Sequence, residues 1–142
     1  KESLMDYILD KDIQISSKGE NYLTHIQLAN HELIADEPES KGGKDKGPNP
    51  YQLLLASLGS CSAITLRMYA QNKKWDIGSV NVKLNLAQVQ KENEKITVII
   101  RKISLGGSLS QEQRERLLAV AKACPVAKIL TGSIEIESSL EN

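Results

Sequence analysis

The sequence predicts an α+β domain in which antiparallel strands surround one long buried helix. Apolar and polar residues alternate before and after residues 51–75, as in strands, whereas residues 51–75 are apolar around the whole circumference of a helix. Short turn sequences join most of the strands, which indicates hairpins and antiparallel pairing. A chain of 142 residues has the length of a single domain with its own core, so we expect residues 1–142 to form one.

The chain begins with a short extension, residues 1–10, that lacks the small-residue cleavage site of a signal peptide. We therefore expect a cytoplasmic protein. Residues 13–15 then alternate, Gly19 supplies a turn, and a second alternating run covers residues 22–28. Residues 33–34 continue the pattern, so this part of the chain predicts three antiparallel strands.

Residues 36–50 predict a long loop, because they hold three of the four prolines and three of the nine glycines. They contain no large apolar residue, and loops of this length are often functional or disordered. We expect this loop to be exposed and mobile.

The long helix is predicted to begin at Asn49 and Pro50, which suit the N-cap and the first turn. Its most apolar part, residues 51–66, is short for a membrane span, so we expect a core helix covered on all sides by sheet from one chain or from two. Gly59 and the serines beside it would let a strand approach closely near Cys61.

The rest of the chain predicts a hairpin, two shorter helices and a last strand. Residues 80–89 and 96–101 alternate on either side of a turn at residues 90–94, and the second run is apolar on much of both faces, as in a central strand. Ser110 and Gln113 form a capping-box pair that opens an amphipathic helix. Cys124 and Pro125 break that helix and restart it through Leu130, and residues 134–136 alternate as a final strand.

The charge pattern predicts no nucleic-acid and no membrane partner. The 18 basic and 18 acidic residues balance, and no basic cluster stands out. The two cysteines and two histidines are not spaced like zinc ligands, so we expect no metal and no cofactor.

The two cysteines, Cys61 and Cys124, are the best candidates for chemistry. In a reducing compartment, a lone pair of cysteines is more often free, catalytic or redox-active than permanently bridged. Cys124 precedes the proline that opens a helix, where backbone amides would favour the thiolate. Cys61 lies in the middle of its helix and needs a cation from elsewhere. Simple packing is the alternative for both, and for Cys61 alone it is the commoner role.

The segments around the cysteines, GPNPYQLLLASLGSCSAITLRMYA and ACPVAKIL, together with ADEP upstream, resemble the OsmC and organic hydroperoxide resistance family. The resemblance covers residues 17–140 and points to the OsmC-like branch. It implies an intertwined homodimer with the long helices at its centre and the sheets around them. It also implies a thiol peroxidase in which Cys61 attacks the hydroperoxide and Cys124 resolves the sulfenic acid as a disulfide. A dithiol such as dihydrolipoamide then reduces that disulfide.

The sequence departs from the family pattern at the groups that activate the attacking thiol. The family's glutamate position holds Tyr51, and no arginine precedes Arg67, for which we expect an ion pair on the far side of the helix. Lys18 is a candidate replacement cation, although it lacks a guanidinium fork. Further candidate polar groups are His31, Asp36 and Glu37. A non-catalytic protein that binds a small apolar ligand or senses redox state is the alternative function.

Overall fold

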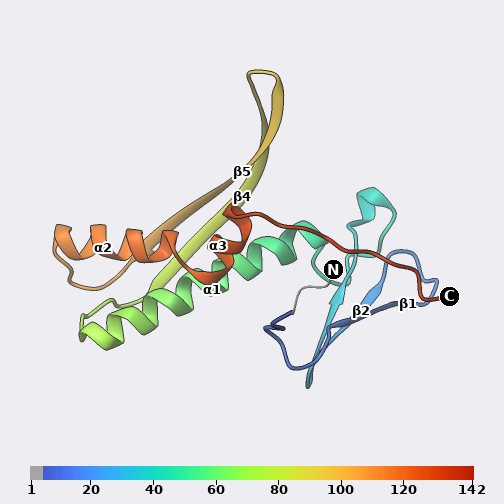
Figure 1. The fold of residues 1–142 in the computed structure, drawn as a ribbon, viewed down its shortest axis with the longest axis horizontal. Coiled ribbons are helices and arrows are strands. Elements are labelled where there is room, and N and C mark those ends of the chain that lie inside the picture. Colours follow the sequence, from blue (N-terminus) through green and yellow to red (C-terminus); the bar gives the residue numbers. More distant parts are fainter. Residues whose placement is uncertain (1–4) are drawn as a thin grey trace. The chain divides into compact units, whose positions relative to one another are not determined.

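A computed structural model describes residues 5–142, which fall into two compact units (Figure 1). One unit ends at Leu53 and the other runs from Leu54 to Asn142. The predicted N-terminal extension lies partly outside the described residues, and residues 5–10 contain no helix or strand. That residues 1–142 act as one domain stays a prediction.

The first unit contains the three predicted strands. They are β1 (Gln14–Ser17), β2 (Thr24–Leu28) and β3 (His31–Ala35), paired antiparallel in the order β1-β2-β3. Gly19 has a φ of 98°, a left-handed conformation that favours glycine in the turn between β1 and β2. The predicted hairpin and its following strand are confirmed.

The loop after β3 is more closely packed than we expected. It contains the short helix η1 (Glu39–Lys41), and Asp36 and Gly43 within it are buried. The Asp36 carboxylate accepts hydrogen bonds from the backbone N–H groups of Glu37, Lys44 and Lys46 at 2.7, 3.3 and 3.1 Å. A Cβ at Gly43 would lie 2.0 Å from the carbonyl oxygen of Glu37, so this fold of the loop requires a glycine there. The loop is therefore not exposed throughout, and its mobility stays a prediction.

The long helix α1 (Pro50–Lys73) begins as the sequence predicts. Asn49 Oδ1 accepts from the backbone N–H of Gln52 at 2.9 Å, and Gln52 Oε1 accepts from that of Asn49 at 2.9 Å. These reciprocal bonds satisfy backbone groups that the first turn leaves free. The N-cap prediction is confirmed.

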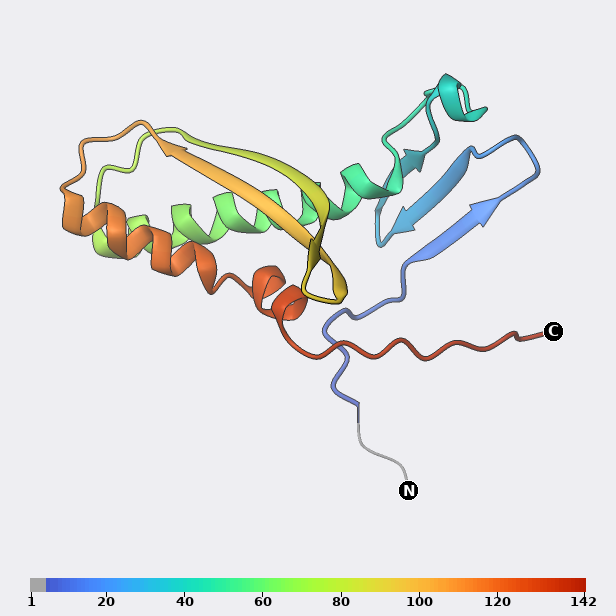
Figure 2. The same ribbon diagram turned by 90° about the horizontal axis from the view of Figure 1, so that it is seen from above.

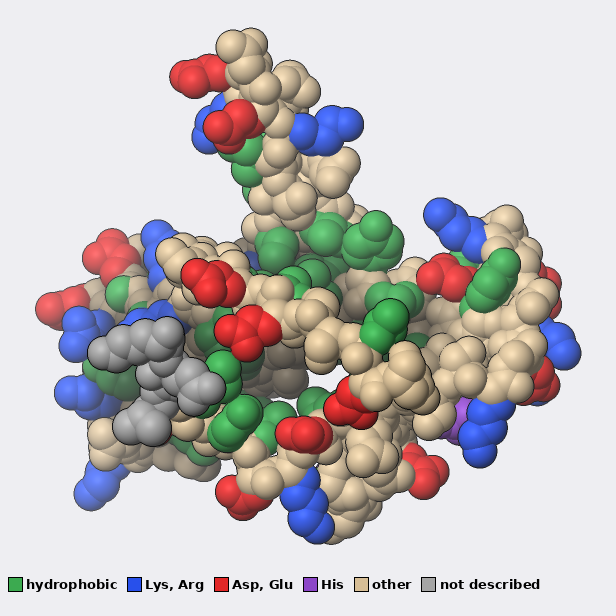
Figure 3. All heavy atoms as spheres, turned by 45° about the vertical axis from the view of Figure 1, so that its right-hand side comes forward, with side chains coloured by type: hydrophobic (Ala, Val, Ile, Leu, Met, Phe, Trp, Pro, Cys, Tyr) green, Lys and Arg blue, Asp and Glu red, His purple; other side chains and the backbone are tan. Residues whose placement is uncertain are grey.

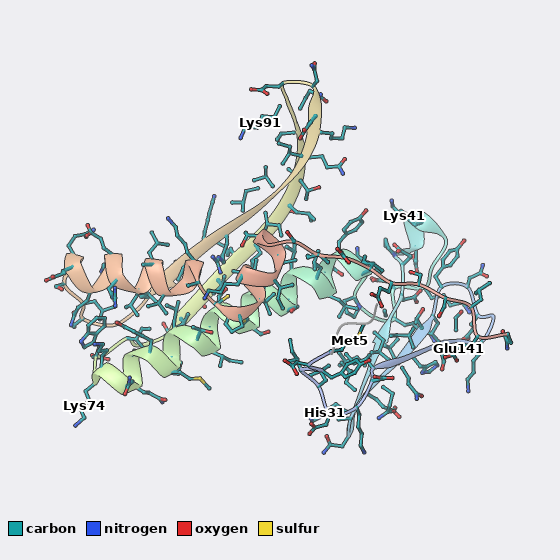
Figure 4. All side chains as sticks on the ribbon, in the orientation of Figure 1. Met5, His31, Lys41, Lys74, Lys91 and Glu141 are labelled. Atoms are coloured by element: carbon teal, nitrogen blue, oxygen red, sulfur yellow. The ribbon has the colours of Figure 1, made fainter. Side chains whose placement is uncertain are left out.

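The second unit packs a long hairpin and two helices against α1 (Figures 1 and 2). The hairpin consists of β4 (Val80–Lys91) and β5 (Glu94–Leu105), paired antiparallel in a two-stranded sheet. Its tip, marked by Lys91 in Figure 4, projects away from the helices. Figure 3 shows hydrophobic side chains on the stem of the hairpin below a charged tip.

Two helices complete this unit. Ser110 Oγ accepts from the backbone N–H of Gln113 at 3.1 Å, and the Gln113 side chain accepts from that of Ser110, so the predicted capping box opens α2 (Gln111–Lys122). After a break at Cys124, α3 (Pro125–Thr131) follows with Pro125 at its first position. Both predicted helix starts are confirmed.

The core of the second unit consists of two apolar clusters. One lies between α1 and α2, and its buried members are Leu66, Ala70, Ile77, Leu117 and Ala121. The other joins α1 and α3 around Leu58, Cys124 and Ala127, with Leu84 and Ile99 of the hairpin packed against it.

A single chain does not bury α1 on every side, so the predicted cover by sheet from one chain is wrong, and cover by sheet from two chains stays a prediction. Its buried residues, Leu58, Gly59, Ser62, Leu66 and Ala70, follow one face. On another face Leu54, Ile64 and Met68 are 41%, 54% and 65% exposed. By length and composition α1 also passes the criteria for a membrane span, with a mean hydropathy of 1.3, but core helices of soluble proteins pass the same test.

Two strand predictions are also wrong for the single chain. β5 is not a central strand, because it pairs with β4 alone in this sheet, and Val98 and Ile100 are exposed on it. Residues 134–136 form no strand, and both isoleucines there are exposed. A strand requires a partner for its backbone groups, and the pattern of a sequence does not supply one.

Candidate functional site

Cys61 lies on α1, where one side of the helix meets the core and the other is exposed. Its thiol is free and half-buried. Thr65, one turn further along, places Oγ1 3.9 Å from Cys61 Sγ, where either group can donate. Gly59 assists the packing beside it, because a Cβ at Gly59 would lie 2.8 Å from Cδ1 of Leu84. The predicted close approach of a strand near Cys61 is therefore confirmed at Gly59.

Cys124 occupies the N-cap position of α3 and is completely buried, with an exposed fraction of 0%. The backbone is extended there, with φ −65° and ψ 152°, because a residue before proline is pushed out of the helical region. Pro125 thus places the thiol between the end of α2 and the start of α3. The expected local setting of Cys124 is confirmed.

The fold brings these two thiols, distant in the sequence, together as a cysteine pair. Cys61 packs against the apolar cluster that contains Cys124, close enough that its side chain lowers the pKa of the Cys124 thiol. Both thiols are free. Two free thiols in one cluster are a precondition for a disulfide, because one thiolate must reach the sulfur of the other.

A cation reaches this cluster from β5. Arg101 Nη1 donates to Cys124 Sγ at 3.8 Å and to Ser62 Oγ at 2.8 Å. Ser62 is itself fully buried, and its hydroxyl donates to the carbonyl oxygen of Leu58 at 2.7 Å. The guanidinium is thereby tied to the buried face of α1 while it contacts the sulfur.

These neighbours determine the charge state that Cys124 favours. Burial raises the pKa of the Cys124 thiol, whereas hydrogen bonds from the Ala127 backbone, Cys61 and Arg101, together with the Arg101 charge, lower it. The lowering contributions prevail, so the pKa of Cys124 lies below its ordinary value. A buried thiol of this kind forms the thiolate more readily than an unassisted one.

The other candidate residues belong to the first unit. Lys18 and His31 are exposed there, so their service to the thiols stays a prediction, and Tyr51, at the family's glutamate position, is exposed as well. The first unit also holds the candidate acids Asp36 and Glu37, and Asp36 binds its own loop.

Among residues 5–142, the contact of Arg67 is not the ion pair that we expected. Its guanidinium donates instead to the carbonyl oxygen of Gly78 at 2.7 Å. Within residues 5–142 no three His, Cys, Asp or Glu side chains gather as metal ligands.

Sequence reasoning missed Arg101 and Ser62, although both leave a signal. Arg101 stands between Ile99 and Ile103 on the inward-facing side of β5, where a charged residue is out of place. Ser62 is spaced four residues from both Leu58 and Leu66, at a core position of α1. A polar residue at a core position needs a partner, and here each is the partner of the other.

Comparison with known proteins shows which family and which solved structures the chain resembles. Residues 43–139 match a family described as OsmC-like protein. No curated protein matches the chain. Among solved structures, one similar protein is an osmotic stress induced and detoxification response protein from Psychrobacter arcticus. It shares 21% identity at a TM-score of 0.70, over 88% of this chain and 91% of that one.

Two further structures have the same fold. An OsmC-like protein from Mycoplasma pneumoniae is 19% identical, with a TM-score of 0.70 over 87% of this chain and 90% of that one. An organic hydroperoxide resistance protein from Legionella pneumophila is 21% identical, with a TM-score of 0.64 over 87% of this chain and 92% of that one. These structures share the α+β fold, with antiparallel sheets and a long helix, over most of this chain.

Proposed function

The chain belongs to the OsmC-like protein family, and from that premise we propose that it reduces organic hydroperoxides with its cysteine pair, Cys61 and Cys124. The observation that carries the proposal is that a half-buried thiol on α1 and a buried thiol at the start of α3 lie at one apolar cluster. Structural relatives from Legionella pneumophila and Elizabethkingia anophelis bear the name organic hydroperoxide resistance protein, which supports this substrate class.

The first step is attack by Cys61, because it is the more accessible thiol of the pair. The Cys61 thiolate bonds to one oxygen of the hydroperoxide, the O–O bond breaks, and the leaving alkoxide takes a proton to become an alcohol. Cys61 is then a sulfenic acid. The apolar residues around it, Leu58 and Leu84 among them, favour a substrate with an apolar group.

The second step uses Cys124. Its thiolate attacks Sγ of the Cys61 sulfenic acid, a disulfide forms, and the hydroxyl group leaves as water after taking up a proton. A dithiol then reduces the disulfide and restores both thiols. This chemistry requires a compartment that keeps thiols reduced, which agrees with a cytoplasmic location.

The functional form in this proposal is a homodimer. Along α1 one row of residues is spaced by three and four positions: Leu54, Ser57, Cys61, Ile64 and Met68. All of them are exposed except the half-buried Cys61, and we call this row the exposed stripe. Its large apolar members face water in the single chain. A second copy over this stripe would remove that apolar surface from water and would enclose Cys61, the attacking thiol.

The proposal is tested by the rate at which the reduced protein consumes cumene hydroperoxide. We expect wild-type protein with dihydrolipoamide to turn over many equivalents, and Cys124→Ser to lose sustained turnover. Cys61→Ser is expected to react no faster than free cysteine. If wild-type protein also reacts only as fast as free cysteine, the chain is not a peroxidase.

The same experiment separates the alternative function. A non-catalytic ligand-binding or redox-sensing protein would form its disulfide once, without sustained turnover in the presence of dithiol. Such a result would leave the cysteine pair as a sensor and would remove the enzyme assignment.

A further inference from the structure

Arg101 holds the sulfur of Cys124 and a hydroxyl of α1 at the same time. Nη1 lies 3.8 Å from Cys124 Sγ and 2.8 Å from Ser62 Oγ. Ser62 is itself held in place, because it is fully buried and its hydroxyl donates to the carbonyl oxygen of Leu58 at 2.7 Å. The fixed donor geometry of a guanidinium suits this double contact better than a lysine ammonium would.

Within the second unit, Arg101 is also the charged group that contacts this sulfur. From α1 the titratable neighbour is Cys61, and from β5 it is Arg101. The nearest charged residues on α2 and α3, Lys122 and Lys128, are exposed. The part of β4 that packs against the cluster contributes the apolar Leu84, the register partner of Arg101.

The Arg101 guanidinium thus contacts Cys124, the less accessible of the two sulfurs. Cys124 is buried beside the guanidinium, whereas Cys61 is half-buried and has Thr65 as its hydroxyl neighbour. In thiol–disulfide exchange, the sulfur with the lower pKa leaves more readily, and attack goes to the sulfur that the thiol can reach.

We propose that Arg101 is the positioning residue that stabilises the thiolate form of Cys124 in the reduced protein, and that it makes Cys124 the leaving group when the disulfide is reduced. The second half rests on the proposed function, because it concerns the disulfide of the catalytic cycle, whereas the first half does not.

The Cys61–Cys124 disulfide is reduced back to two thiols in two exchange steps. One thiolate of an external dithiol bonds to Cys61 Sγ, the Cys61–Cys124 bond breaks, and Cys124 takes the electron pair as a thiolate beside Arg101. The second thiolate of the dithiol then attacks the reductant sulfur that is bonded to Cys61, and the dithiol becomes a cyclic disulfide. Cys61 leaves with the electron pair, so the protein gains two electrons and the dithiol loses two.

The first half is tested by titrating Cys124 alone. In a Cys61→Ser background labelled with ¹³Cβ-cysteine, the NMR shift of Cys124 reports its ionisation as a function of pH. Removing the charge with Arg101→Met is expected to move the midpoint upward by about one pH unit or more. Lys102→Met is the matched control, since Lys102 is the next residue of β5 and is exposed; it is expected to leave the midpoint unchanged.

Arg101→Lys keeps the charge without the fork and is expected to give a midpoint between those of the parent and Arg101→Met. If Arg101→Met does not fold, Arg101→Gln, which also removes the charge, takes its place, and a midpoint equal to the parent's would then overturn the proposal. An unchanged midpoint in folded Arg101→Met overturns it directly. Neither result depends on any peroxide reaction.

The second half is tested by trapping the mixed disulfide. The wild-type disulfide, formed with diamide, is mixed briefly with excess glutathione, quenched in acid and mapped by peptide mass. Glutathione on Cys61 with Cys124 free supports the proposal, whereas glutathione on Cys124 overturns this half. Because diamide replaces the hydroperoxide, failure of the peroxidase assay and failure of this inference are separate results.

Discussion

Cys61 and Cys124 share one apolar cluster but differ in what surrounds each sulfur. Cys124 is buried against Arg101 and the Ala127 backbone, whereas Cys61 is half-buried beside Thr65. Burial without a cation would make a thiol inert, and exposure without a partner would leave a sulfenic acid open to further oxidation. The pair therefore combines an accessible thiol with a stabilised one.

Ser62 is predicted to act through Arg101. Ser62→Ala removes the hydroxyl that holds Nη1, so the guanidinium loses its anchor while its charge remains. We expect the pKa of Cys124 to rise by less than in Arg101→Met, and stability to fall by about 1 kcal/mol from the lost hydrogen bonds. Ser60→Ala is the control, since Ser60 is exposed on the same helix. Equal thiol titrations for Ser62→Ala and the parent would contradict the anchoring role.

Asp36 is predicted to make the loop at residues 36–50 sensitive to acid. Burial raises the pKa of its carboxyl, but backbone hydrogen bonds from Lys46, Glu37 and Lys44, with the Lys46 charge, outweigh burial and hold that pKa below its usual 3.8. Because the folded pKa is depressed, the stabilisation is complete above the ordinary value and disappears as pH falls through the lowered one.

Hydrogen exchange at the amides of Lys44 and Lys46 measures this effect. Protection of both amides is expected to persist at neutral pH and to fall in acid below the ordinary pKa. Asp36→Asn is expected to lower it already at neutral pH, whereas Asp45→Asn, at an exposed position of the same loop, is not. Protection that does not depend on Asp36 would show that other contacts hold the loop.

At the scale of elements, the reciprocal cap of α2 is predicted to contribute measurably to the second unit. Ser110→Ala removes the acceptor for the Gln113 backbone N–H, which lies 3.1 Å away. The expected loss is about 1 kcal/mol in urea unfolding. Ser108→Ala, exposed and outside the helix, is expected to change stability by less than about 0.5 kcal/mol. Equal losses for the two variants would mean that the cap is not the cause.

The elements that the sequence predicted correctly are those with local causes. The two capping pairs, the break at Cys124 and Pro125, and the hairpin turns depend on residues that are neighbours in the chain. The elements predicted wrongly depend on distant partners. Residues 134–136 alternate like a strand and find no strand to pair with, and β5 has the pattern of a central strand without a second neighbour.

The candidate site likewise has a part that the local sequence predicts and a part that depends on tertiary packing. Both cysteines were recognisable from the segments around them, whereas their contact depends on α1 and α3 meeting in one cluster. Arg101 lies 23 residues before Cys124 and 39 residues after Ser62. Only the packing of β5 against both helices brings these groups together, and no local signal encodes that packing.

At the scale of the whole molecule, the apolar surface of α1 is the least satisfied feature of the single chain. Leu54, Ile64 and Met68 of the exposed stripe are accessible to water. Val98 and Ile100 of β5 are also exposed. Clusters of exposed apolar side chains mark association surfaces more often than free surface. The proposed homodimer gives this surface a partner.

Ile64→Glu is predicted to weaken that homodimer, because it places a carboxylate in the stripe one turn from Cys61. Sedimentation at micromolar concentration is expected to show a dimer for wild type and a monomer for Ile64→Glu. Gln90→Glu adds the same charge at an exposed position of β4 near the tip of the hairpin and is expected to remain dimeric. A wild-type protein that stays monomeric at every concentration tested would contradict the proposal.

The central claim, that Cys61 and Cys124 form one redox pair, is tested most directly by the intact mass of the reduced protein after one equivalent of cumene hydroperoxide. We predict that wild type loses two hydrogens, the mark of a disulfide, and that peptide mapping joins Cys61 to Cys124. We predict that Cys124→Ser instead gains one oxygen, trapped by dimedone on Cys61, and that Cys61→Ser is unchanged. Wild-type protein that keeps its mass, or that gains oxygen without losing hydrogens, would contradict the account.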